Sequence, residues 1–89
     1  MPKVFFTTNL RRHVDCPTSE ADGLTVREVL DAVFAVQERA RHYVLDDQAA
    51  LRKHMTIIVD GQSLKDRVRL SDPVHANSQI YVLQALSGG

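Results

Sequence analysis

The residues most suited to taking part in a reaction are the last four of the sequence: Leu86, Ser87, Gly88 and Gly89. Only four glycines occur among the 89 residues, and two of them are the last two. Two adjacent glycines remove every Cβ next to the terminal carboxylate and permit backbone angles that are closed to other residues. Such an end is suited to entering a narrow channel, carboxylate first. A chain end can also be glycine-rich without a purpose, so the remaining sequence has to distinguish a working tail from an idle one.

The other potentially reactive side chains match no known catalytic or metal-binding pattern. The four histidines show neither metal-ligand spacing nor a paired nucleophile, and no phosphate-cradling glycine loop is present. Cys16 is the single cysteine, so neither a disulfide within the chain nor a cysteine metal cage can form. The pair Asp46-Asp47 is typical of a solvated turn. We therefore expect no catalytic residues, no metal and no bound cofactor, and predict that the protein is not an enzyme.

Length and charge exclude further classes of protein. With 44% apolar residues, 89 residues build one domain with a modest core. Eleven basic residues balance eleven acidic ones, which removes long-range attraction to nucleic acid or to an anionic membrane. The local basic run from Arg52 to His54 is predicted to be a solvated approach to a strand. No apolar run approaches the roughly 20 residues that a membrane span needs, and Val4 to Phe6 is too short for a signal peptide. We expect a soluble, cytoplasmic protein.

A helix beginning near Thr25 is the clearest element that could support the tail. Thr25 is followed three residues later by Glu28, which is the spacing of a capping box. Apolar residues then recur at the spacing of one helix face, and we predict that this face packs on the core. They are Val26, Val29, Leu30, Val33 and Phe34.

Strands are expected on both sides of this helix. Residues 3–8 are rich in aromatic and β-branched types, and residues 55–59 precede Asp60-Gly61, a hairpin turn pair. Other predicted elements are a short second strand at 13–16, turn chemistry at 17–23, a helical turn within 41–52 and a short return strand after Gly61. A final strand is expected within 78–86, and it leads directly into the tail.

This order of elements predicts an α+β fold, with the main helix packed across one face of a mixed sheet. If the first and last strands pair as central neighbours, the architecture is the ubiquitin-like β-grasp. Periodicity alone does not determine that strand order. We expect residues 1–84 to form the domain and residues 85–89 to be a flexible tail.

Several segments in this order resemble the MoaD/ThiS-type sulfur carriers, which are small ubiquitin-like β-grasp proteins. The matching segments cover nearly the whole chain: KVFF, GLTVREVLDAVF, LRKHMTIIVDG, LSDPV and IYVLQALSGG. The longer middle is more like the branch that serves amino-acid sulfur assembly. Two departures stand out: HANSQ replaces the Asp-Gly-Asp turn frequent in the family, and LQAL lacks the prolines often found before the tail.

The resemblance implies a defined chemistry for the terminus. An α-carboxylate, with a pKa of roughly 3.3–3.7, is ionised at neutral pH and is a poor electrophile. A ubiquitin-activating-like partner would use ATP to adenylate Gly89, and a sulfur donor protein would convert it to a thiocarboxylate for a sulfur-accepting biosynthetic enzyme. Gly88 and Ser87 would thread the partner's channel. Leu86 would anchor the tail outside the channel or be the last packed strand residue.

A docking surface is also predicted, from strand alternation. If Ile80 and Val82 face the helix, Tyr81 and Leu83 face outward. The same parity places Phe5 and Ile58 on the outer face, while Met55, Ile57 and Val59 point inward. These four outward residues would form an apolar patch of the kind that marks a partner site.

Two other functions remain open from the sequence. A ubiquitin-like modifier would use the same activated Gly89 to form isopeptide bonds with lysines. A β-grasp binding module would carry an idle tail. The final sulfur acceptor is not readable from the sequence.

Overall fold

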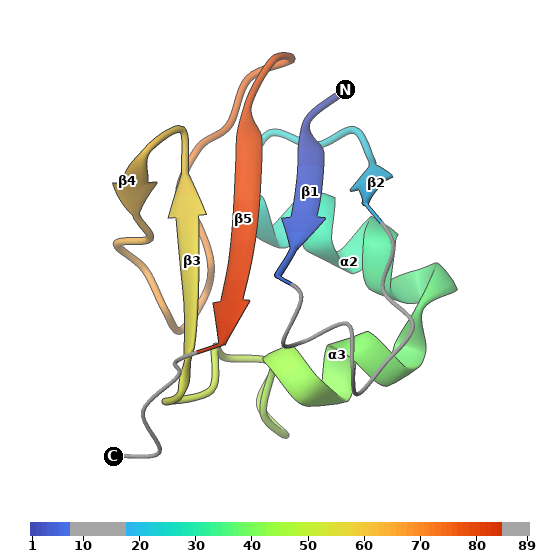
Figure 1. Ribbon diagram of the computed structural model, residues 1–89, viewed down its shortest axis with the longest axis vertical. Coiled ribbons are helices and arrows are strands. Elements are labelled where there is room, and N and C mark those ends of the chain that lie inside the picture. Colours follow the sequence, from blue (N-terminus) through green and yellow to red (C-terminus); the bar gives the residue numbers. More distant parts are fainter. Residues whose placement is uncertain (8–17, 85–89) are drawn as a thin grey trace.

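The computed structural model describes residues 1–7 and 18–84 of the chain. The second strand predicted at 13–16, Cys16 and the tail residues Leu86 to Gly89 lie outside these ranges. The described part contains five strands and two helices (Figure 1). They are β1 (Lys3–Phe6), β2 (Ser19–Glu20), α2 (Val26–Val36), α3 (Glu38–Val44), β3 (Met55–Val59), β4 (Gln62–Ser63) and β5 (Gln79–Gln84).

The five strands form one mixed sheet in the order β2-β1-β5-β3-β4. The first and last strands, β1 and β5, are parallel and adjacent, whereas the other neighbours are antiparallel. The two helices cover one face of the sheet and leave the other open (Figure 1). This is the β-grasp arrangement, so the predicted fold class is confirmed, including the central pairing that the sequence left undetermined.

The predicted helix face forms the centre of the core. Phe34 is fully buried, and its ring lies 6.3 Å from that of Phe6 on β1. The other four predicted positions of this face are buried as well: Val26, Val29, Leu30 and Val33. From the sheet, alternate residues of the central strands complete the core: Val4, Phe6, Met55, Ile57, Ile80 and Val82. Val59, which was also predicted to point inward, is half-buried at the end of β3.

The start of α2 follows the predicted cap with one variation. The side chain of Thr25 accepts a hydrogen bond from the amide of Glu28 at 3.2 Å. The Glu28 carboxylate accepts in return from the amide of Leu24 at 3.3 Å, and not from that of the cap residue itself. Gly23 is required beside this cap, because a Cβ there would stand 2.9 Å from the backbone nitrogen of Val29.

Two local predictions need correction. Strand β2 lies at Ser19–Glu20, within the stretch predicted as a turn, and pairs with β1 as a two-residue edge strand. Edge pairing of so short a segment requires no β-branched run, so composition does not reveal it. The second helix begins at Glu38, directly after α2, and is longer than the predicted turn; its residues Ala40 and Val44 are buried.

The hairpin prediction at Asp60-Gly61 is confirmed. Both residues have positive φ, 49° and 84°, as a two-residue turn between twisted strands requires. Within the described residues, no helix combines the length and apolar character that a membrane crossing needs.

Candidate functional site

An apolar row crosses the open face of the sheet on its three central strands. Tyr81 of β5 stands in register with Phe5 of β1 on one side and with Ile58 of β3 on the other. The rings of Phe5 and Tyr81 stack with centroids 4.7 Å apart and planes inclined by 15°. Tyr81 is the most open of the three, with 39% of its surface exposed, and the other two are half-buried.

Leu83 extends this row toward the end of β5. It lies two residues beyond Tyr81 on the same face and stands opposite Thr56 of β3. The structure thus brings together the four residues that alternation placed on the outer face: Phe5, Ile58, Tyr81 and Leu83. We call them the outer patch. Whether a partner docks on the outer patch stays a prediction.

Polar groups border the outer patch at the beginning of β1 and β5. Lys3 stands opposite Gln79 in the β1–β5 register and opposite Glu20 in the β1–β2 register. The Lys3 ammonium and the Glu20 carboxylate form an ion pair at 3.9 Å, with both side chains about half exposed. An apolar centre with a charged margin is the usual composition of a protein-binding face.

The predicted tail, residues 85–89, follows β5, which is paired with a strand on each side. Gln84, the last residue of β5, pairs with Met55, and β5 is hydrogen-bonded on one side to β1 and on the other to β3. The amide of Thr7 extends the β1 side by donating to the Val82 carbonyl at 3.2 Å. The predicted attachment residue Gly89 and the threading residues Gly88, Ser87 and Leu86 lie outside the described part, so their roles stay predictions.

The opposite end of β5 is fixed by Asp60. Its carboxylate accepts hydrogen bonds from the Gln79 amide at 2.9 Å and from the Ser78 hydroxyl at 2.8 Å. These two bonds, the backbone one first, hold the pKa of Asp60 below its ordinary value, and His75, whose Nε2 lies 3.5 Å from the carboxylate, contributes in the same direction. Ser78 is fully buried. The HANSQ segment, which replaces the Asp-Gly-Asp turn, is therefore held by hydrogen bonds from Ser78 and Gln79 to Asp60. The sequence did not reveal these bonds.

Hydrogen bonds to the carboxylates of Asp66 and Asp72 hold the loop between β4 and β5. The Asp66 carboxylate accepts from the Ser71 hydroxyl and from the amides of Arg69 and Val68. These bonds, that of Ser71 first, lower the pKa of Asp66 to about 2. Asp72 accepts in turn from the amides of Lys65 and Asp66. Both carboxylates serve as acceptors for local backbone, which is a structural role.

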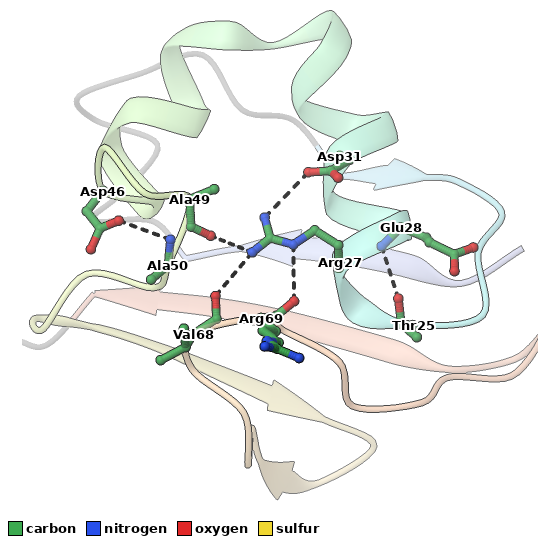
Figure 2. Close-up of polar contacts among 9 residues, drawn as sticks. All are labelled: Thr25, Arg27, Glu28, Asp31, Asp46, Ala49, Ala50, Val68 and Arg69. Carbon is green, nitrogen blue, oxygen red and sulfur yellow. Dashed lines mark hydrogen bonds and ion pairs between the residues drawn. The ribbon is translucent and has the colours of Figure 1, made fainter.

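Arg27 joins three segments on the helix-covered side of the sheet (Figure 2). Its guanidinium donates to the carbonyls of Arg69 at 3.1 Å, Ala49 at 2.6 Å and Val68 at 3.3 Å. Asp31, one helical turn on, lies 3.7 Å from the same guanidinium. Arg27 thereby holds the loops after α3 and β4 against the start of α2, away from the outer patch.

No catalytic or metal-binding arrangement emerges from the described ranges 1–7 and 18–84. Among them, no three His, Cys, Asp or Glu residues are placed to hold a metal ion. Asp60, His75 and Ser78 are neighbours, but the Ser78 hydroxyl donates to Asp60 and accepts from the His75 amide, so it is not paired with a base. What this arrangement offers is a folded body that presents an apolar face.

Comparison with known proteins agrees with this description. A sequence profile of the ThiS family matches residues 4–89. No curated protein matches the sequence significantly.

Solved structures of the same fold come from bacteria and archaea. A chain of the crystal structure of the Amycolatopsis orientalis BexX/CysO complex superposes with a TM-score of 0.82 at 23% identity, over 100% of both chains. SAMP1 from Haloferax volcanii gives 0.78 at 21% identity, over 99% of this chain and 98% of that one. CysO of Mycobacterium tuberculosis gives 0.79 at 19% identity, over 97% and 100%. At these identities the likeness establishes a shared ubiquitin-like fold.

Proposed function

The chain belongs to the ThiS family, and on that premise we propose that it is a sulfur carrier protein. In this proposal a partner enzyme adenylates the carboxylate of Gly89, and a sulfur donor converts it to a thiocarboxylate. A biosynthetic enzyme then takes the sulfur. The carrier is a substrate at each step and contributes no catalytic group.

One observation carries the proposal: the family match runs through to Gly89 on a body whose central strand leads into the tail. Gln84 is paired with Met55 of β3, so the sheet fixes the position from which residues 85–89 continue. Five residues follow it. Fully extended, five residues span at most roughly 17 Å, enough to carry a terminal carboxylate well away from the domain.

The chemistry balances with partners of stated classes. The Gly89 carboxylate attacks the α-phosphorus of ATP, forming the acyl-adenylate and releasing pyrophosphate. A sulfur nucleophile then attacks the acyl carbon and displaces AMP, which leaves the thiocarboxylate. The carbonyl carbon keeps its oxidation state throughout, so no redox agent is needed when sulfide is the donor. Glycine at positions 88 and 89 leaves this carbon free of neighbouring side chains.

The outer patch is the surface we assign to partner docking. A tail of five residues gives little affinity alone, so an enzyme that acts on it needs a second contact on the domain. The outer patch lies on the strand that leads into the tail, and the central row Phe5–Tyr81–Ile58 spans three strands. An aromatic pair at the centre of an apolar face is a common source of binding energy.

The test is ATP–pyrophosphate exchange with the adenylating enzyme encoded by the same organism. The full chain is expected to support exchange, and a chain shortened by Gly88 and Gly89 is expected to support none while keeping its circular dichroism spectrum. Equal exchange with both chains would contradict the proposal and favour a binding module whose tail is idle.

A protein modifier is the second candidate, and one observation favours it: structural neighbours include a protein named small archaeal modifier protein 1. A modifier shares the adenylation step and differs in the acceptor, which is a lysine amine. Digestion of proteins from cells that express the chain distinguishes the two. After tryptic cleavage at Arg69, lysines carrying residues 70–89 through Gly89 would support the modifier, and their absence alongside a thiocarboxylate would support the carrier.

A further inference from the structure

The turn before β3 lies beside the start of the tail. Met55, the first residue of β3, pairs with Gln84, the last residue of β5, in an antiparallel register. Paired residues in such a ladder have Cα atoms about 4.5–5.5 Å apart. Figure 1 shows the beginning of β3 and the end of β5 at the same end of the sheet. Arg52, Lys53 and His54 therefore border the point from which residues 85–89 continue, and an enzyme that receives Gly89 must approach this turn.

Arg52 is fixed in this turn through its backbone and through one side-chain nitrogen. Its amide donates to the Val44 carbonyl at 3.0 Å, and its Nε donates to the His42 carbonyl at 2.9 Å. Its own carbonyl accepts from the guanidinium of Arg67 at 2.8 Å. Arg67 donates with the same nitrogen to the Met55 carbonyl, also at 2.8 Å, so one side chain ties the turn to the first residue of β3.

The outer half of the Arg52 guanidinium has no partner among the described residues. Within residues 1–7 and 18–84, its two terminal nitrogens have neither a hydrogen-bond acceptor nor an ion-pair partner. The guanidinium lines a shallow recess of about 210 Å³ together with His42, Tyr43 and His54. We call these four residues the Arg52 recess. It holds one permanent cation, two imidazoles and no carboxylate.

Among the described residues, the acidic side chains nearest the recess are not ion-paired with it. Asp46 and Asp47 follow α3 and line a neighbouring hollow with Arg41, and this hollow shares His42 with the recess. The Asp46 carboxylate accepts from the amides of Gln48 and Ala50, and no ion pair links either aspartate to the recess within the described residues. Lys53, adjacent to the recess, is exposed and adds positive charge.

We propose that the Arg52 recess binds a carboxylate side chain at the mouth of the tail-accepting site of the activating enzyme. The two terminal nitrogens of this anchored guanidinium match the two oxygens of a carboxylate, and this pairing is directional as well as electrostatic. The contact would orient the domain when the outer patch docks, so that the tail is aligned with the channel of the activating enzyme. This inference rests on the proposed function and adds a second recognition element to it.

The kinetic test compares variants in ATP–pyrophosphate exchange. Arg52→Gln is expected to raise the KM for the carrier roughly five- to tenfold with kcat unchanged, as expected for the loss of a partly desolvated ion pair. Arg52→Lys keeps the charge but loses the fork, so an intermediate KM is expected. Lys65→Gln removes one charge at the other end of β3 and should leave KM unchanged. Equal KM values for Arg52→Gln and wild type would overturn the inference while leaving the proposed function intact.

A second measurement is independent of the enzyme. Acetylated pentaglutamate is titrated into the labelled full chain at constant ionic strength, followed by NMR at the Arg52 Nε–H and the His42 and His54 ring signals. Saturable shifts in the wild type that vanish in Arg52→Gln support the recess. No shifts, or shifts only with inorganic phosphate, overturn it. If the wild-type chain is not adenylated at all, the proposed function fails and this titration alone decides for or against the recess.

Discussion

The rings of Phe5 and Tyr81 stack across the parallel β1–β5 pair, 4.7 Å apart and inclined by 15°. They lie on the face that the helices leave open, on the two strands at the centre of the sheet. An aromatic pair of this kind contributes about 0.5–1.5 kcal/mol beyond its buried area. The pair therefore stiffens the outer patch, and it keeps a large apolar surface in place for a partner.

Tyr81→Ser tests the outer patch. Tyr81 is 39% exposed and lies outside the buried core, so the variant is expected to fold, with the loss only of the stacking on Phe5. Removing the central ring should raise the KM for adenylation about tenfold or more, because central aromatic anchors dominate interface energies. The measurement is ATP–pyrophosphate exchange as a function of carrier concentration.

Val36→Ser is the matched control for that experiment. Val36 is 85% exposed at the end of α2, on the helix-covered side of the sheet, so its loss removes exposed apolar surface elsewhere. Its KM should equal that of the wild type. Equal KM values for Tyr81→Ser and Val36→Ser would show that the outer patch does not dock the enzyme.

Thr25→Ala tests the cap that starts α2. The substitution removes the acceptor of the Glu28 amide bond, and loss of such a cap costs about 1 kcal/mol of unfolding free energy. Urea unfolding measures this difference. Thr25→Ser keeps an oxygen at the same place and should recover most of the lost stability. An alanine variant as stable as the wild type would show that the cap contributes little here.

Much of the architecture is predictable from the sequence because the signals are local. The Thr25–Glu28 spacing, the apolar face of α2 and the Asp60-Gly61 turn each act within a few residues, and each is found in the structure. Strand alternation likewise places Phe5, Ile58, Tyr81 and Leu83 on one face. The parallel β1–β5 pairing follows from contacts between segments more than 70 residues apart along the chain, so periodicity alone could not determine it.

The missed features depend on tertiary contacts. Arg27 looks like an ordinary charged residue on an exposed helix face, yet it donates to three carbonyls of distant loops. The run from Arg52 to His54 was predicted to be solvated. Lys53 and His54 are exposed, but Arg52 is half-buried and held by the carbonyl of His42. No sequence pattern encodes which carbonyl an arginine will reach.

The Asp66→Asn variant tests whether the ionised Asp66 carboxylate, through the hydrogen bonds that it accepts, stabilises the fold in a pH-dependent way. The folded chain lowers the pKa of Asp66 from its ordinary value of 3.8 to about 2, because the carboxylate accepts hydrogen bonds from the Ser71 hydroxyl and the Arg69 amide. The resulting stabilisation is complete above about pH 5 and is lost as the pH falls through the unfolded value toward the folded one.

The expected result is a stability difference between wild type and Asp66→Asn that shrinks as the pH is lowered from about 6 to about 2. Urea unfolding at several pH values measures it, and both chains retain Asp60, whose lowered pKa affects them equally. A difference that stays constant over this range would mean that ionisation of Asp66 does not stabilise the fold.

The central claim concerns the terminal carbonyl, and intact-mass spectrometry tests it most directly. The chain is incubated with ATP, its adenylating enzyme and a sulfide source. The account predicts a mass gain equal to the exchange of one oxygen for one sulfur, located on Gly89 by fragmentation. Gly88→Ala should fold normally and show no gain, because a methyl group next to the reacting residue obstructs a channel shaped for glycine. An unchanged mass for the wild-type chain would contradict the account, provided that the enzyme is shown to be active in the same mixture.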